Sequence, residues 1–166
     1  MNIPSYFKEY AHDLTLIRVE ANRKRYSGTN KQRTGRKSSV LLGDVDREYY
    51  TEYIGILAEL LIRDYCDKDK DCSNYCVSTF VKDSKYVYND QDIKIKKNDA
   101  IKHISIKACE YSLKANQYAI DNEDVDLVVF VLFTSPAEYE YHSFPIVEIQ
   151  KWEVSQSYSP YYELKI

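Results

Sequence analysis

The feature that most constrains the fold is an unbroken apolar run, Leu127 to Phe133. Its seven residues make a typical strand and fall far short of the roughly 18 that a membrane-spanning helix needs. A half-exposed strand alternates apolar and polar side chains, so a continuous run indicates a central strand covered on both faces. We therefore expect a β-sheet flanked by other layers, and no membrane segment.

The remaining hydrophobic pattern predicts helices first and strands later. A first helix is expected at residues 4–21. A second is expected from about Asp44 to Tyr65, with an apolar stripe of Tyr50, Ile54, Leu57 and Leu61. Strands are expected at 75–81, 85–88, 92–96, 101–108, 126–133 and 144–152, with a short helix at 113–121. With no repeat or linker, this order predicts one α/β domain over residues 1–166.

Composition fits an intracellular globular protein. The chain has 166 residues, of which 44% are hydrophobic and 30% charged, enough for one compact core. Polar residues interrupt the first 13 positions where a signal peptide needs an apolar stretch, so we expect a cytoplasmic location. Reduced thiols are expected for four cysteines, with structural zinc as the alternative, although no Cys-x-x-Cys pair occurs: Cys66, Cys72, Cys76 and Cys109.

The charge is strongly asymmetric although the net charge is only -3. Residues 18–37, here called the basic arm, hold eight basic residues and one acid, which leaves the rest of the chain at -10. Such an arm attracts phosphate backbones, or else it folds onto the protein's own acidic face or stays solvated. The candidate nucleic-acid contacts are Arg23, Lys24, Arg25, Lys31, Arg33, Arg36 and Lys37. The glycine spacing around the arm does not fit a P-loop.

A hairpin with a two-residue turn is expected at residues 98–99, and it would gather chemically useful side chains on one face. In that register the numbers of paired residues add to 197, so Asp92 lies opposite Ser105 and Asp90 opposite Lys107 on one polar face. Carboxylates beside a lysine can hold a divalent cation and place a cationic donor next to a scissile phosphate. The alternative is the solvated face of an exposed hairpin.

Glu59 is a further acid, on the expected second helix. It lies on the side of the helix opposite the apolar stripe, one turn after Gly55, which leaves room for another element to approach. Glu59 is therefore either a metal ligand or a solvated surface acid.

These residues together resemble the PD-(D/E)xK nuclease superfamily. The resemblance covers about Asp44 to Glu153 and rests on residues 55–59, 92–93 and 104–107, the strand at 126–133 and the closing strand with Trp152. It implies a restriction-endonuclease-like αβββαβ core, a central mixed β-sheet flanked by helices. Residues 1–43 would add the N-terminal helix and basic arm, and residues 154–166 a C-terminal tail.

The resemblance also implies roles for individual residues. Glu59 and Asp92 would bind Mg²⁺ or Mn²⁺, and Lys107 would position or activate the attacking water, with Ser105 completing the catalytic set. The expected function is a metal-dependent endonuclease that hydrolyses phosphodiester bonds of DNA, with the basic arm on the backbone. Cutting both strands of a duplex often needs two sites, so a homodimer is one expected assembly.

Ser105 departs from the family pattern, because an acid usually stands at that position. In some members with Ser-x-Lys, the missing acid comes from the following helix, and here Glu110, Asp121 or Glu123 would supply it. Alternatively the metal site is lost, because hard cations are selected by charged oxygen ligands. The fold would then serve only to bind nucleic acid or a protein, for example as an inhibitor. The proline of the motif is also absent, but it has no catalytic role.

Overall fold

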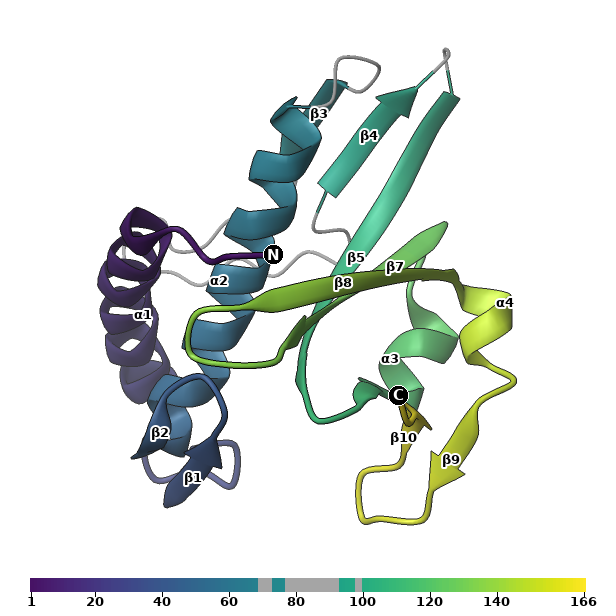
Figure 1. Cartoon of the computed structure of the whole chain (residues 1–166). Coiled ribbons are helices and arrows are strands. Elements are labelled where there is room, and N and C mark those ends of the chain that lie inside the picture. The colour runs from purple at the N-terminus through teal and green to yellow at the C-terminus, as the bar shows by residue number, and fades with distance from the viewer. Residues whose placement is uncertain (69–72, 77–92, 98–99) are drawn as a thin grey trace.

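The computed structural model describes residues 1–68, 73–76, 93–97 and 100–166 (Figure 1). Its helices are α1 (Ser5–Tyr26), α2 (Arg47–Lys68), α3 (Gln117–Asn122) and α4 (Ile146–Ile149). Its strands are β1 (Arg36–Ser39), β2 (Gly43–Asp46), β3 (Ser73–Cys76), β4 (Ile93–Lys97), β5 (Ala100–Glu110), β6 (Leu113–Asn116), β7 (Leu127–Phe133), β8 (Tyr139–Pro145), β9 (Glu153–Ser155) and β10 (Tyr161–Leu164). The α/β fold class is therefore confirmed.

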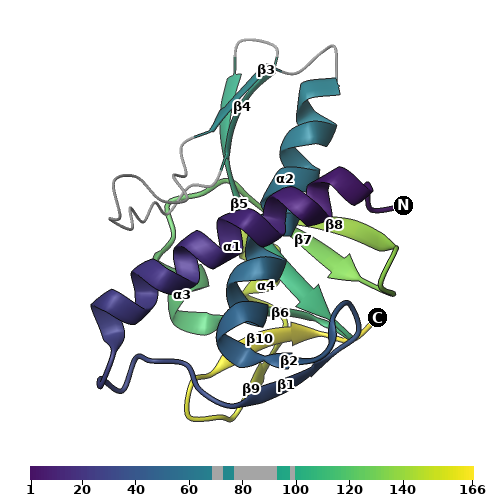
Figure 2. The ribbon, with the colours of Figure 1, turned by 90° about the vertical axis from the view of Figure 1, so that its left-hand side faces the viewer.

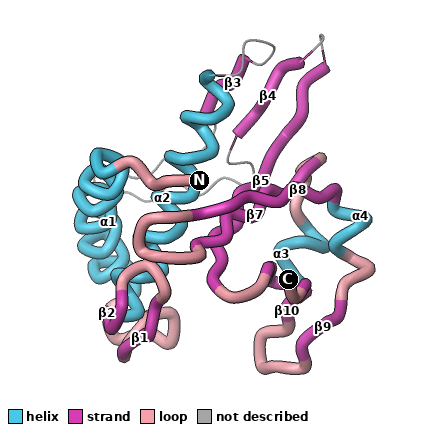
Figure 3. Tube along the Cα trace, viewed as in Figure 1, coloured by secondary structure: helices cyan, strands magenta, loops and turns pink. Residues whose placement is uncertain are grey.

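The central sheet is mixed and has the strand order β3-β4-β5-β7-β8. Strands β5 and β7 pair in parallel, and the other neighbours are antiparallel. A short hairpin of β1 and β2 and a second sheet of order β6-β10-β9 complete the strands (Figure 3). A parallel pair needs a crossover between its strands, and here β6 and α3 provide it.

The predicted hairpin register is confirmed where the structure describes it. Ile93 pairs with Ile104, and the pairing continues through β4 and β5 with residue numbers that add to 197. Asp90, Asp92 and the turn at 98–99 lie outside the described residues. The same is true of the predicted strand at 85–88 and of most of the one at 75–81.

Strand β7 is an interior strand of the sheet and is covered on both faces, as predicted. Val129, Val131 and Phe133 pack in a core with α2, while Val128 and Phe130 pack in a second core with α3 and α4. The alternation places α2 on one face of the sheet and α3 on the other. Within the part of the chain that the structure describes, every helix is too short or too polar to span a bilayer.

Helix α1 crosses α2 and covers the side of α2 away from the sheet (Figure 2). Consequently Ile56, Leu57 and Ala58, three successive residues of α2, are all fully buried. The predicted first helix is confirmed but too short, because α1 continues to Tyr26 and thereby includes the first part of the basic arm.

Two local predictions are wrong. The helix expected at 113–121 begins only at Gln117, because residues 113–116 alternate buried and exposed as strand β6, and the Asn116 side chain then accepts from the Ala119 N–H as a helix cap. The strand expected at 144–152 is also wrong: β8 ends at Pro145, which lacks the N–H that a strand needs, and α4 follows. The C-terminal residues form β9 and β10, so they are part of a sheet.

Candidate active site

Three polar side chains meet where β5 runs beside the segment that follows α3. The Lys107 Nζ lies 2.5 Å from Glu123 Oε1, and the Ser105 Oγ donates to the same oxygen at 3.3 Å. Ser105 is 1% exposed, and the side chain of Glu123 is 4% exposed. A lysine, a serine and a carboxylate therefore converge in a largely buried site.

The alternation of β5 determines which of its side chains enter this site. Ile104, Ile106 and Ala108 pack toward α2, so Ser105 and Lys107 point to the opposite face, toward α3. Ser105 thus stands on the same face as Lys107, as the sequence predicted.

Glu123 reaches β5 because the chain turns sharply between α3 and β7. Its own N–H donates to the Ala119 carbonyl and closes the last turn of α3. Three residues later, Asp126 and His103 exchange hydrogen bonds: the Asp126 N–H donates to the His103 carbonyl at 2.9 Å, and the His103 N–H donates to Asp126 Oδ2 at 2.8 Å. These two hydrogen bonds hold the segment between α3 and β7 against β5, two residues before Ser105.

The second oxygen of Glu123 makes the site chemically unusual. Among the described residues, Glu123 Oε2 is buried and has no hydrogen-bond partner. A buried polar atom without a partner typically costs about 1–3 kcal/mol, more when it is charged. An oxygen of this kind is a suitable ligand for a hard divalent cation, which prefers carboxylates.

The two other acids named as substitutes for the missing one are engaged elsewhere. Glu110 accepts hydrogen bonds from Ser39 Oγ, the Leu41 N–H and the Tyr50 hydroxyl, and it ties β1 and α2 to the end of β5. Burial, followed by the nearby Glu110 carboxylate, raises the pKa of Tyr50 above its ordinary value.

Asp121 faces the second sheet. Its Oδ1 accepts from the Tyr162 hydroxyl at 2.9 Å and from Gln150 Nε2 at 3.0 Å. Of the three substitutes, Glu123 is therefore the one that the fold brings to Ser105 and Lys107.

Glu59 is buried at 9% exposure, so its interpretation as a solvated surface acid is wrong. The helical pattern assumed one buried face of α2, whereas α1 covers a second one. Glu59 pairs with Arg63 one turn later, with 2.9 Å between Arg63 Nη2 and Glu59 Oε2. It belongs to the helix on the face of the sheet opposite Lys107, and Asp92 lies outside the described residues.

The basic arm is largely folded onto acids of the same protein, as one of the sequence alternatives held. Arg23 pairs with Glu48 and Arg33 with Glu52, both on α2, while Arg36 pairs with Asp44 and Asp46 of β2. Each of these three arginines keeps at least half of its side chain exposed.

The remaining candidate nucleic-acid contacts of the basic arm pair with an exposed acid or lie over a tyrosine ring. Lys24 pairs with the exposed Glu20, and Lys37 lies over the Tyr50 ring. Arg25 and Lys31 lie over the ring of Tyr26.

The side chains of two of the four cysteines can be described. Among the described residues, Cys66 and Cys109 are buried thiols outside any disulfide, and burial raises the pKa of Cys109 to about 11. Cys72 lies outside the described residues. Within the described part of the chain, no three His, Cys, Asp or Glu residues are grouped so that they could hold one metal ion.

Comparison with known proteins gives no relative: no protein family, no curated protein and no solved structure matches the chain.

Proposed function

We propose that this protein is a metal-dependent nuclease that hydrolyses phosphodiester bonds of DNA. The observation that carries the proposal is the buried carboxylate of Glu123, which shares one oxygen between Lys107 and Ser105 and leaves the other without a partner among the described residues. The Glu123 carboxylate would thus supply, from the segment after α3, the acid that the Ser-x-Lys sequence lacks.

The order of elements supports the same proposal. Helix α2, strands β3, β4 and β5, helix α3 and strand β7 follow one another along the chain, with β6 inserted before α3. This is the αβββαβ order that the resemblance to the PD-(D/E)xK nucleases implies, and Ser105 and Lys107 lie on its third strand. We propose on this basis that the core is restriction-endonuclease-like.

The proposed chemistry assigns a role to each residue. Glu123 Oε2 and the carboxylate of Asp92, directly before β4, would hold Mg²⁺ or Mn²⁺. Glu59, the helix ligand that the resemblance implies, lies across the sheet from Lys107 and is therefore left out of the proposed site. The ion would lower the pKa of a bound water and neutralise charge on the phosphate. Lys107, held by Glu123 at 2.5 Å, would donate to the attacking water or to a phosphate oxygen and stabilise the charge that develops there.

Ser105 has a smaller part in this chemistry. Its hydroxyl donates to Glu123 Oε1 and orients the carboxylate, which is a positioning role. We therefore propose that Ser105 is tolerated at the acid position because Glu123 supplies the negative charge from another element.

A second candidate function is a nuclease fold without activity that binds nucleic acid or a protein. The salt bridge itself favours it, because the Lys107 ammonium already neutralises Glu123 without a metal ion. The two candidates differ in whether a divalent cation binds.

Titration calorimetry with Mn²⁺ separates them. The nuclease proposal expects one specific site in the wild type, lost or at least about tenfold weaker in Glu123→Gln, since a charged oxygen ligand is removed. The control is Glu138→Gln, because Glu138 is an exposed acid beyond the end of β7. Absence of specific binding in the wild type, or equal binding by wild type and Glu123→Gln, would reject the proposed metal site and favour the inactive fold.

A further inference from the structure

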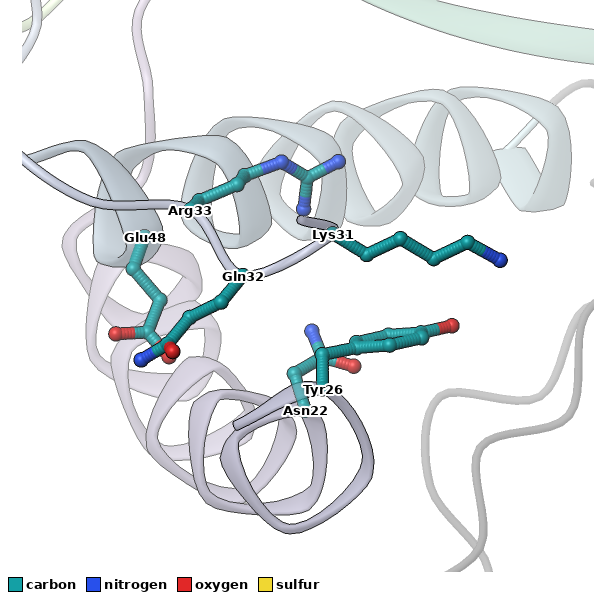
Figure 4. A pocket seen from close by; sticks show the side chains of 6 residues that line it. All are labelled: Asn22, Tyr26, Lys31, Gln32, Arg33 and Glu48. Atoms are coloured by element: carbon teal, nitrogen blue, oxygen red, sulfur yellow. The ribbon is translucent and has the colours of Figure 1, made fainter. Parts of the chain in front are cut away.

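A pocket of about 280 Å³ lies at the C-terminal end of α1, outside the proposed active site (Figure 4). Its walls come from α1, from the connection between α1 and β1, and from the first turn of α2. The lining residues are Asn22, Tyr26, Lys31, Gln32, Arg33 and Glu48. The basic arm thus encloses a cavity as well as presenting charges.

The walls are held by hydrogen bonds within the protein. The carboxylate of Glu52, which is buried, accepts from Asn22 Nδ2 at 2.9 Å and from Arg33 Nη1 at 3.3 Å. One carboxylate therefore fixes two walls of the pocket, one from α1 and one from the connection.

The connection that carries Gln32 is shaped by a turn. Gly28 has a φ of +75°, a conformation that favours glycine, and its N–H donates to Gln32 Oε1 at 3.1 Å. The Thr29 hydroxyl donates to the Tyr26 carbonyl at 2.6 Å. The turn brings Gln32 back against the end of α1.

The two ends of the pocket differ in charge. At one end lie the amide of Gln32 and the carboxylate of Glu48, which Arg23 Nε contacts at 3.1 and 3.2 Å. Figure 4 shows that Lys31 extends away from Glu48, along the ring of Tyr26 toward its hydroxyl. The Lys31 ammonium lies 5.8 Å from the ring centroid.

These groups match the parts of one nucleotide. An aromatic ring stacks on any nucleobase, an amide and a carboxylate can hydrogen-bond to the polar edge of a base, and an exposed ammonium attracts a phosphate. A free inorganic anion fits less well, because the Glu48 carboxylate stands at one end. A base within a duplex has its edge paired and its faces stacked, so it cannot enter a pocket of this kind without leaving the helix.

We propose that this pocket binds one unpaired nucleotide of a nucleic-acid strand, with the base taking the place of Lys31 over the Tyr26 ring and the exposed Lys31 ammonium turning to the phosphate. The inference rests on the proposed function in taking nucleic acid as the ligand, and it deepens that function by naming the substrate class. The preferred substrates are then single strands and duplexes with an unpaired nucleotide.

Fluorescence anisotropy in EDTA tests the pocket without cleavage. The probes are a labelled 20-base-pair duplex, the same duplex with one extra unpaired nucleotide, and a single strand of equal length, with a free mononucleotide as competitor. The wild type is expected to bind the last two probes about tenfold more tightly than the perfect duplex, in the range that one stacked base contributes.

Substitutions at Tyr26 assign the preference to the pocket. Tyr26→Ala should remove it, and Tyr26→Phe, which keeps the ring, should retain it. The control is Tyr118→Ala, which removes an exposed tyrosine on α3, and circular dichroism verifies that each variant is folded. Equal preference in wild type and Tyr26→Ala, or no preference in the wild type, would overturn the inference. A mononucleotide that competes as strongly as the bulged duplex would overturn the strand-bound form of the site.

The outcome is separable from that of the proposed function. Binding that depends on Tyr26 in a protein that never cleaves would support the pocket and reject the nuclease. Metal-dependent cleavage, together with binding that is the same in wild type and Tyr26→Ala, would support the nuclease and reject the pocket.

Discussion

Breaking the Lys107–Glu123 pair from its two ends should give unequal losses of stability. In Lys107→Met, the Glu123 carboxylate stays buried at 4% exposure and loses its cation. Breaking a fully buried pair in this way costs about 3–5 kcal/mol. Because Lys107 is 24% exposed, water can reach part of the vacated space, so we expect a loss of about 2–3 kcal/mol in EDTA. For a chain of this size that lowers the Tm by about 4–12 °C.

Glu123→Gln should cost less, about 1 kcal/mol, because the partly exposed Lys107 ammonium can turn toward water. The double variant Lys107→Met/Glu123→Leu should be more stable than Lys107→Met alone, since it leaves no uncompensated buried charge.

Urea unfolding followed by circular dichroism, in EDTA at neutral pH, measures all four proteins. Unchanged stability in Lys107→Met, or a larger loss in Glu123→Gln than in Lys107→Met, would show that the buried carboxylate does not depend on this lysine.

Three further predictions concern other parts of the chain. Glu110→Ala should lower the free energy of unfolding by about 3 kcal/mol, because three donors lose their acceptor, and Glu110→Gln by about 1 kcal/mol; urea unfolding that gives equal losses would contradict this. Burial raises the pKa of the Cys109 thiol from 9.0 to about 11, so the stability that this protonated thiol contributes is fully present below pH 9 and is lost between pH 9 and 11. Unfolding measured at pH 8 and pH 10.5 should therefore show that the wild type loses more stability than Cys109→Ala between the two pH values. An equal loss in the two proteins would refute the raised pKa. The double variant Arg33→Glu/Arg36→Glu should bind DNA more weakly and with a flatter dependence on salt, whereas an unchanged salt slope in anisotropy would place the contact elsewhere.

Local patterns in the sequence were sufficient to predict the central strands. Residues 127–133 could only form a covered strand, and the two-residue turn expected at 98–99 predicted which side chains of β4 and β5 face each other. Both inferences depend on the strict two-residue period of a strand, which needs no knowledge of the rest of the fold.

Features that depend on distant segments were harder to predict. The burial of Glu59 follows from α1 lying across α2, which no pattern within α2 reveals. The pairing of the basic arm with acids of α2 and β2 likewise depends on tertiary contacts. Glu123 was one of three acids in the sequence that satisfied the same requirement, and only the turn between α3 and β7 distinguishes it from Glu110 and Asp121.

The end of β8 and the start of α3 could have been predicted from single residues in the sequence. Pro145 argued against a strand that continues to Trp152, because it cannot donate a ladder hydrogen bond. Asn116 was a suitable cap for a helix that begins at Gln117. Both signals were outweighed by the surrounding apolar residues, which fit a strand and a helix equally well over such short lengths.

The most direct test is a cleavage assay with purified wild type and Lys107→Ala. Each protein is incubated with single-stranded, double-stranded and branched DNA and with RNA, in Mg²⁺, in Mn²⁺ and in EDTA, and the products are resolved by length. The proposed nuclease predicts cleavage by the wild type that requires the metal ion, and loss of cleavage with retained binding in Lys107→Ala. Full activity of Lys107→Ala, or no cleavage of any substrate by the wild type, would contradict the proposed nuclease.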